Sequence, residues 1–104
     1  MSKFNEREKS FEKKFVRDEE LQFKVNAKRN KYLGEWAAEK LGKSDNDKEA
    51  YVLEVIKSDF AEPGDEDVFR KIQGDFKKVS VSIPDSEIRE QMGSLLERAK
   101  KDFL

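Results

Sequence analysis

The chain has 104 residues, enough for one small domain with a modest core. Charged residues make up 43% of it, yet the formal net charge is −1, so the positive field expected of a nucleic-acid-binding protein is missing. The sequence contains neither Cys nor His, which excludes disulfides, thiolate metal sites and a histidine acting as base or pH sensor. An enzyme without them would need tuned carboxylates or a lysine, usually in a deep pocket that a small domain rarely builds, so we expect no catalytic residues, metal or cofactor.

The sequence also lacks the features of a membrane or secreted protein. No apolar run approaches the roughly 18 residues that a membrane span requires, and no secretory leader is recognisable. Charges of both signs alternate along the chain, which is typical of solvent-facing helix surfaces. We therefore expect a cytoplasmic location and no membrane span.

The segment 1–17 is the first expected element, and it is highly charged. Of the first twenty residues, twelve are charged, six of each sign. Phe4, Phe11 and Phe15 are spaced i, i+7 and i+11, so a helix would align them in one narrow stripe. This pattern favours a segment that becomes ordered against a partner. A frayed, solvated terminus is the alternative.

A rough comparison of free energies supports partner binding. Burying three Phe side chains contributes about 5–9 kcal/mol. Fixing the backbone of a segment this long costs about 1–2 kcal/mol for each residue. The three rings are therefore too few to hold the segment in place, and we expect a protruding arm that is disordered in the free chain.

Four helices are expected after the arm. Apolar spacing predicts a helix over about 19–41, which acidic residues open and Gly42 ends. A second helix begins after a cap at Ser44 or Asp45 and ends before Pro63-Gly64. Its expected apolar face is Ala50, Leu53, Ile56 and Phe60, widened by Val52 and Val55.

The third and fourth helices follow the same periodicity. One runs from Asp65 to about Val79, and the other begins after a cap at Ser82 or Asp85 and reaches about Phe103. The alternation over 79–83 could form a strand, but it would have no partner, so we favour an extended linker. Short connections favour antiparallel neighbours. The prediction is an all-α four-helix bundle over 18–104.

Two groups of charged residues are candidates for ligand binding. Asp45, Asp47 and Glu49 resemble the start of a calcium loop, but Ala50 and Ile56 stand where that loop needs Gly and an acid, so we reject it. Lys28, Arg29 and Lys31 could receive an anion or a nucleotide phosphate. A solvated, charge-balanced surface is the favoured alternative for these three cations.

Four segments in order resemble one known family. They are residues 7–15 (REKSFEKKF), 18–30 (DEELQFKVNAKRN), 33–42 (LGEWAAEKLG) and 57–71 (KSDFAEPGDEDVFRK). Together they are similar to the alphaproteobacterial ATPase inhibitor zeta subunit. The resemblance covers nearly the whole chain.

The resemblance implies an inhibitor of ATP hydrolysis by the rotary F-type ATP synthase, peripheral at the inner membrane. Residues 1–17 would insert at a catalytic interface of the alpha and beta subunits, near the rotor subunit gamma, and block rotation. The free chain would be a monomer. By this resemblance, the arm residues that contact the partner are Phe4, Arg7, Glu8, Lys9, Phe11, Glu12, Lys14 and Phe15.

Two other functions remain open from the residues alone. The chain could be a helical adaptor whose arm binds a different partner. It could also be a nucleotide sensor or small enzyme that uses Lys28, Arg29 and the acids near Asp65. Recovery of ATP synthase subunits in a pull-down would favour the inhibitor, and nucleotide titration would test the sensor.

Overall fold

The computed structural model describes residues 3–60 and 64–104, with only the backbone for residues 3–6. These residues contain five α-helices and no strand, which confirms the predicted all-α class. The helices are α1 (Lys3–Arg17), α2 (Glu19–Lys40), α3 (Asp45–Ser58), α4 (Glu66–Lys78) and α5 (Asp85–Lys101).

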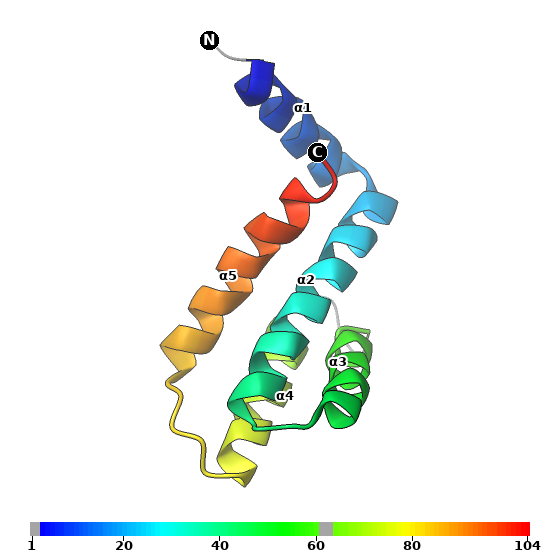
Figure 1. Cartoon of the computed structure of the whole chain (residues 1–104). Helices are drawn as coiled ribbons and strands as arrows, with labels where there is room; N and C mark the ends of the chain where they lie inside the picture. The colour runs from blue at the N-terminus through cyan, green and yellow to red at the C-terminus, as the bar shows by residue number, and fades with distance from the viewer. Residues whose placement is uncertain (1–2, 61–63) are drawn as a thin grey trace.

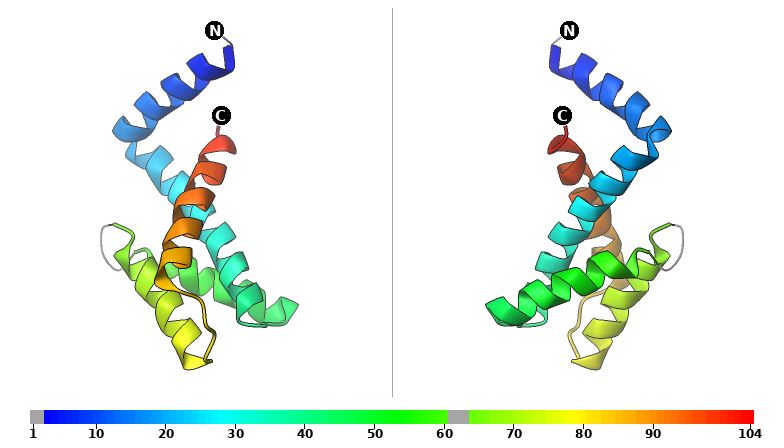
Figure 2. Two further views of the ribbon diagram at one scale, coloured as in Figure 1. Left: turned by 90° about the vertical axis from the view of Figure 1, so that its left-hand side faces the viewer. Right: turned by 90° about the vertical axis from the view of Figure 1, so that its right-hand side faces the viewer.

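Helices α2 to α5 form the bundle, and α1 protrudes from it. The long helix α2 packs against both α3 and α5, while α4 packs against α3 and α5 on the far side in Figure 1. Figure 2 shows α1 leaving the start of α2 at a sharp bend and extending past the end of α5. The molecule is therefore elongated, with principal extents of 48 × 27 × 26 Å.

Local chemistry explains both ends of α2 and the start of α5. Asp18 is the N-cap of α2, and its Oδ1 accepts a hydrogen bond from the backbone N–H of Leu21 at 3.1 Å. After α2, Gly42 adopts a φ of +72°, a left-handed conformation that favours Gly at a helix end. The predicted caps of α5 at Ser82 or Asp85 are wrong. Pro84 occupies the N-cap position, where its fixed φ suits the extended backbone that precedes the helix.

The core lies between the four bundle helices. Trp36 is half-buried, and its ring meets that of Phe76 edge to face, with the centroids 5.7 Å apart. The segment between α4 and α5 is not a strand, and its Val81 and Ile83 pack against the core. The buried hydrophobic cluster consists of Leu33, Ala37, Ala38, Tyr51, Val55, Val68, Phe69, Ile72, Phe76, Ile88 and Met92.

The predicted apolar face of α3 is correct only in part. Val55 is buried as expected, but Leu53 and Phe60 are 55% and 60% exposed, and Tyr51, which the prediction left out, is buried. Tyr51 takes the inward position because its ring packs in the core while its hydroxyl donates a 2.8 Å hydrogen bond to Asp75 on α4. Burial, together with this hydrogen bond, raises the pKa of Tyr51 above its ordinary value.

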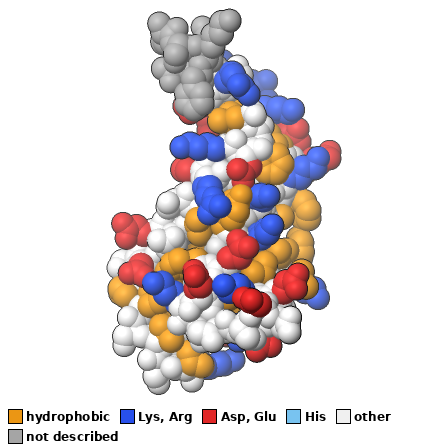
Figure 3. All heavy atoms as spheres, viewed as in Figure 1, with side chains coloured by type: hydrophobic (Ala, Val, Ile, Leu, Met, Phe, Trp, Pro, Cys, Tyr) orange, Lys and Arg blue, Asp and Glu red, His pale blue; other side chains and the backbone are white. Residues whose placement is uncertain are grey.

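Polar contacts also join α4 to α5. Arg89 donates two hydrogen bonds, of 2.8 and 3.0 Å, to the carboxylate of Glu66. The guanidinium lowers the pKa of Glu66, because its hydrogen bonds favour the charged carboxylate. Arg89 also stacks on the Phe69 ring at 3.7 Å from the centroid. The face of the molecule seen in Figure 3 carries interspersed charges of both signs, with no block of one sign.

Candidate functional site: the arm and the end of α5

The predicted arm is almost entirely helical. Its helix, α1, stops for one residue at Asp18 before α2 begins at Glu19. The backbone N–H of Asp18 still donates to the carbonyl of Lys14 at 2.9 Å, while its φ and ψ of −104° and 101° are extended. The bend between the two helices is therefore made at this residue.

One side chain of α2 ties the end of the arm to the bundle. Gln22 Nε2 donates a 2.7 Å hydrogen bond to the backbone carbonyl of Phe15. That carbonyl lies in the last turn of α1, where carbonyl groups have no hydrogen-bond donor within the helix. The bond fixes the last turn of the arm relative to α2.

The helical geometry of α1 places the predicted contact residues other than Lys9 on one side, and Lys9 lies on the opposite side. Glu8 lies close to the phenylalanine stripe, Arg7 and Lys14 flank the stripe on one edge, and Glu12 lies on the other. The backbone of Phe4 belongs to α1, but its side chain lies outside the described residues. Phe11 and Phe15 stack, with ring centroids 6.2 Å apart.

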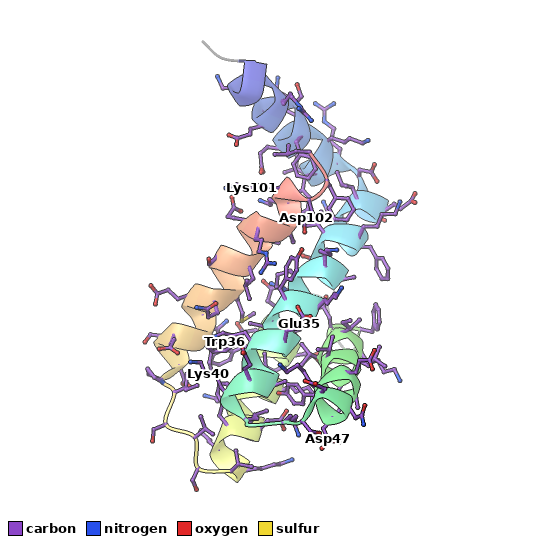
Figure 4. All side chains as sticks on the ribbon, viewed as in Figure 1. Glu35, Trp36, Lys40, Asp47, Lys101 and Asp102 are labelled. Carbon is purple, nitrogen blue, oxygen red and sulfur yellow. The ribbon has the colours of Figure 1, made fainter. Side chains whose placement is uncertain are left out.

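This side of α1 faces the end of α5. Glu8, Phe11 and Phe15 are half-buried, whereas Arg7, Lys9 and Lys14 are exposed. A groove of about 600 Å³ separates α1 from the last turn of α5 and the chain end, and Phe11, Glu12, Lys100 and Leu104 are among the residues that line it. Figure 4 labels Lys101 and Asp102 at this end of α5, beside the lower half of α1.

Lys100 makes the closest described contact across the groove. Its Nζ lies 3.3 Å from Glu12 Oε1 and 4.8 Å from the centroid of the Phe15 ring. The Lys100 side chain is only 15% exposed, and its Nζ also lies 3.3 Å from Glu97 on its own helix. Sequence reasoning missed Lys100, because a contact across 88 positions leaves no periodic signal in a single sequence.

The second predicted cluster, Lys28, Arg29 and Lys31, is not assembled into one site. Lys31 is exposed, and Lys28 lies over the ring of Tyr32 at 5.7 Å. Arg29 is 1% exposed and is held by other parts of the chain. Its Nε donates to Asn30 Oδ1 at 2.7 Å and its guanidinium pairs with Asp65 at 3.1 Å. Anion binding by these three residues stays a prediction.

Comparison with known proteins identifies the family. The chain matches the family described as ATPase inhibitor subunit zeta over residues 1–102. It belongs to that family. The matched range contains all of α1 and the bundle, so the resemblance inferred from the four sequence segments is confirmed.

The fold also matches a solved relative. A protein solved by solution NMR is 43% identical and superposes with a TM-score of 0.70, covering 80% of this chain and 94% of that one. No curated protein matches the chain. None of the described helices is long and apolar enough to cross a membrane. Membership in the ATPase inhibitor subunit zeta family supports a role as an inhibitor that acts on ATP synthase.

Proposed function

We propose that the chain inhibits ATP hydrolysis by inserting α1 between an alpha and a beta subunit of the ATP synthase catalytic head, near the gamma subunit. An occupied interface would be unable to complete the movement that accompanies hydrolysis, and rotation would stop. The chain would act as a monomer on the cytoplasmic side of the inner membrane, with no catalysis of its own. The observation that carries the proposal is the protruding α1 helix in a chain of the ATPase inhibitor subunit zeta family.

The composition of α1 supports insertion into a protein groove. A free helix of 15 residues is marginally stable in water, so most of its stability must come from packing. The described anchors, Glu12, Phe15 and the Phe15 carbonyl, all lie in its second half. A partner groove would supply the missing apolar contacts around Phe4, Phe11 and Phe15.

Charge along α1 supports a defined register within such a groove. Arg7 and Lys14 on one edge of the phenylalanine stripe, and Glu8 and Glu12 nearer the other, give the helix a positive and a negative side. A partner with complementary charges would accept the helix in one rotation about its axis and not in the opposite one. Lys9 would add a contact away from the stripe.

Substitution of one ring tests the proposal. We expect Phe11→Ala to raise the concentration needed for half-maximal inhibition of the purified catalytic head about tenfold or more, because anchors of this kind contribute about 2 kcal/mol or more to binding. Phe60→Ala is the matched control, since it removes a phenyl group that is 60% exposed on the bundle. Equal inhibition by both variants would contradict insertion through the arm.

A further inference from the structure

We infer that Lys100 is a positioning residue that holds the phenylalanine side of α1 against the end of α5 and competes with the partner for it. This inference rests on the proposed function. Its basis is the location of Lys100, which contacts Glu12 and Phe15, two residues that the inserted arm would present to the partner.

The contact is built from both helices. Lys100 directs one ammonium group at a carboxylate 3.3 Å away and at an aromatic ring whose centroid is 4.8 Å away. The Lys100 side chain is 15% exposed while that of Glu12 is 51% exposed, so the cation is largely covered and the carboxylate remains open to water. Such a pair is weak enough to break, because a half-exposed ion pair is screened by solvent.

The half-buried rings show which side of α1 is covered in the free chain. Phe11 lines the groove of about 600 Å³, and the Phe15 ring lies against the Lys100 ammonium. A groove of this size leaves the Phe11 ring incompletely packed. The same side of α1 cannot lie against α5 and against a partner groove simultaneously, so insertion requires the arm to move away from Lys100.

The bend provides a place for that movement. Asp18 is the single residue between α1 and α2, and a change of its backbone dihedral angles would redirect the whole arm. Gln22 holds the Phe15 carbonyl at the same joint, so the arm would pivot close to its own last turn. The fraction of chains in which the arm is released from α5 then limits how fast the inhibitor binds the catalytic head.

Distance measurement tests the position of the arm in the free chain. The sequence has no Cys, so Ser10→Cys on α1 and Ser94→Cys on α5, both exposed positions, would give two unique spin labels. We expect a narrow distance distribution that Lys100→Met broadens and shifts to longer distances, because Met keeps an apolar stem but loses the charge. Lys101→Met removes the same charge one residue further on and is expected to keep the narrow distribution.

Inhibition kinetics test the competition. We expect Lys100→Met to raise the association rate constant for inhibition of the purified catalytic head about three- to tenfold, the range expected from losing one exposed ion pair and one cation–π contact. Lys101→Met is expected to associate at the unchanged rate.

The outcomes separate this inference from the proposed function. An unchanged distance distribution in Lys100→Met would overturn the positioning role, and unchanged or slower association with a broadened distribution would overturn the competition. If neither Lys100→Met nor the unchanged chain inhibits, the proposed function fails and the competition falls with it. The distance distributions would still decide whether Lys100 positions the arm.

Discussion

Two adjacent buried side chains of α2, Arg29 and Asn30, connect this helix to α3 and α4. Arg29 lies on α2 and reaches Asp65, the N-cap residue of α4. Its neighbour Asn30 accepts a bond from Arg29 and donates a 3.0 Å bond to Asp59, the C-cap residue of α3. The fork of the guanidinium satisfies both Asn30 and Asp65 in one fixed geometry. Arg29 and Asn30 together therefore connect α2 to Asp65 and Asp59, on either side of the α3–α4 connection.

Replacing this arginine with lysine tests its structural role. We expect Arg29→Lys to lower the free energy of unfolding by about 1–3 kcal/mol, because one ammonium cannot reproduce the directed bonds to Asn30 and Asp65. Urea denaturation at neutral pH measures the change. Lys31→Arg, the converse substitution at an exposed position, is expected to stay within about 0.5 kcal/mol.

An unfolding midpoint for Arg29→Lys equal to that of the unchanged chain would show that the polar contacts do not stabilise the fold.

The sequence analysis grouped Arg29 with Lys28 and Lys31 because the three lie close together in the chain. The burial of Arg29 was not predicted, because its partner Asp65 lies 36 residues away in the chain. Nothing in the sequence distinguishes Asp65 from the other acidic residues in the first turns of helices.

The close packing of α2 against α3 depends on one glycine of α2. A Cβ built on Gly34 of α2 would lie 3.0 Å from the Val52 Cα of α3. That atom belongs to the backbone, so it cannot turn aside as a flexible side chain would. Gly34 therefore lets α2 and α3 approach each other at their crossing. A Cβ built on Gly74 of α4, in contrast, would meet nothing within 4 Å.

These two glycines give a matched pair of substitutions. We expect Gly34→Ala to lower the free energy of unfolding by about 1–3 kcal/mol, because the added methyl group forces α3 away from α2. Gly74→Ala is expected to raise it by about 0.5–1 kcal/mol, because Ala is the better helix former at an open position. Denaturant unfolding of both variants measures the two shifts. Stabilisation by Gly34→Ala would contradict the close approach.

The helices themselves were largely predictable from local chemistry, but their inward faces were less so. Gly42 and the acids near residue 19 indicated the ends of α2, because capping acts within a few residues. The predicted face of α3 included the buried Val55 but missed Tyr51, because apolar spacing alone does not reveal that the Tyr51 hydroxyl has a partner on α4. Likewise, the spacing of Phe11 and Phe15 predicted a shared helix side, but not that the end of α5 covers it.

The whole molecule combines a packed bundle with a helix that has few anchors. The core joins α2, α3, α4 and α5, and none of the α1 side chains that the structure describes belongs to it. The arm meets the bundle through Gln22 at its last turn and Lys100 at the far end of the chain. A body that folds on its own and an arm that can be redirected are the properties that the proposed inhibition requires.

Inhibition of the purified catalytic head by the full chain and by a chain that begins at Asp18 tests the central claim most directly. The shortened chain keeps the α2 cap and the whole core, so we expect helical circular dichroism and cooperative unfolding like those of the bundle. We predict that the full chain inhibits ATP hydrolysis and that the shortened chain, at the same concentration, does not. Equal inhibition by a folded chain lacking residues 1–17 would contradict the account.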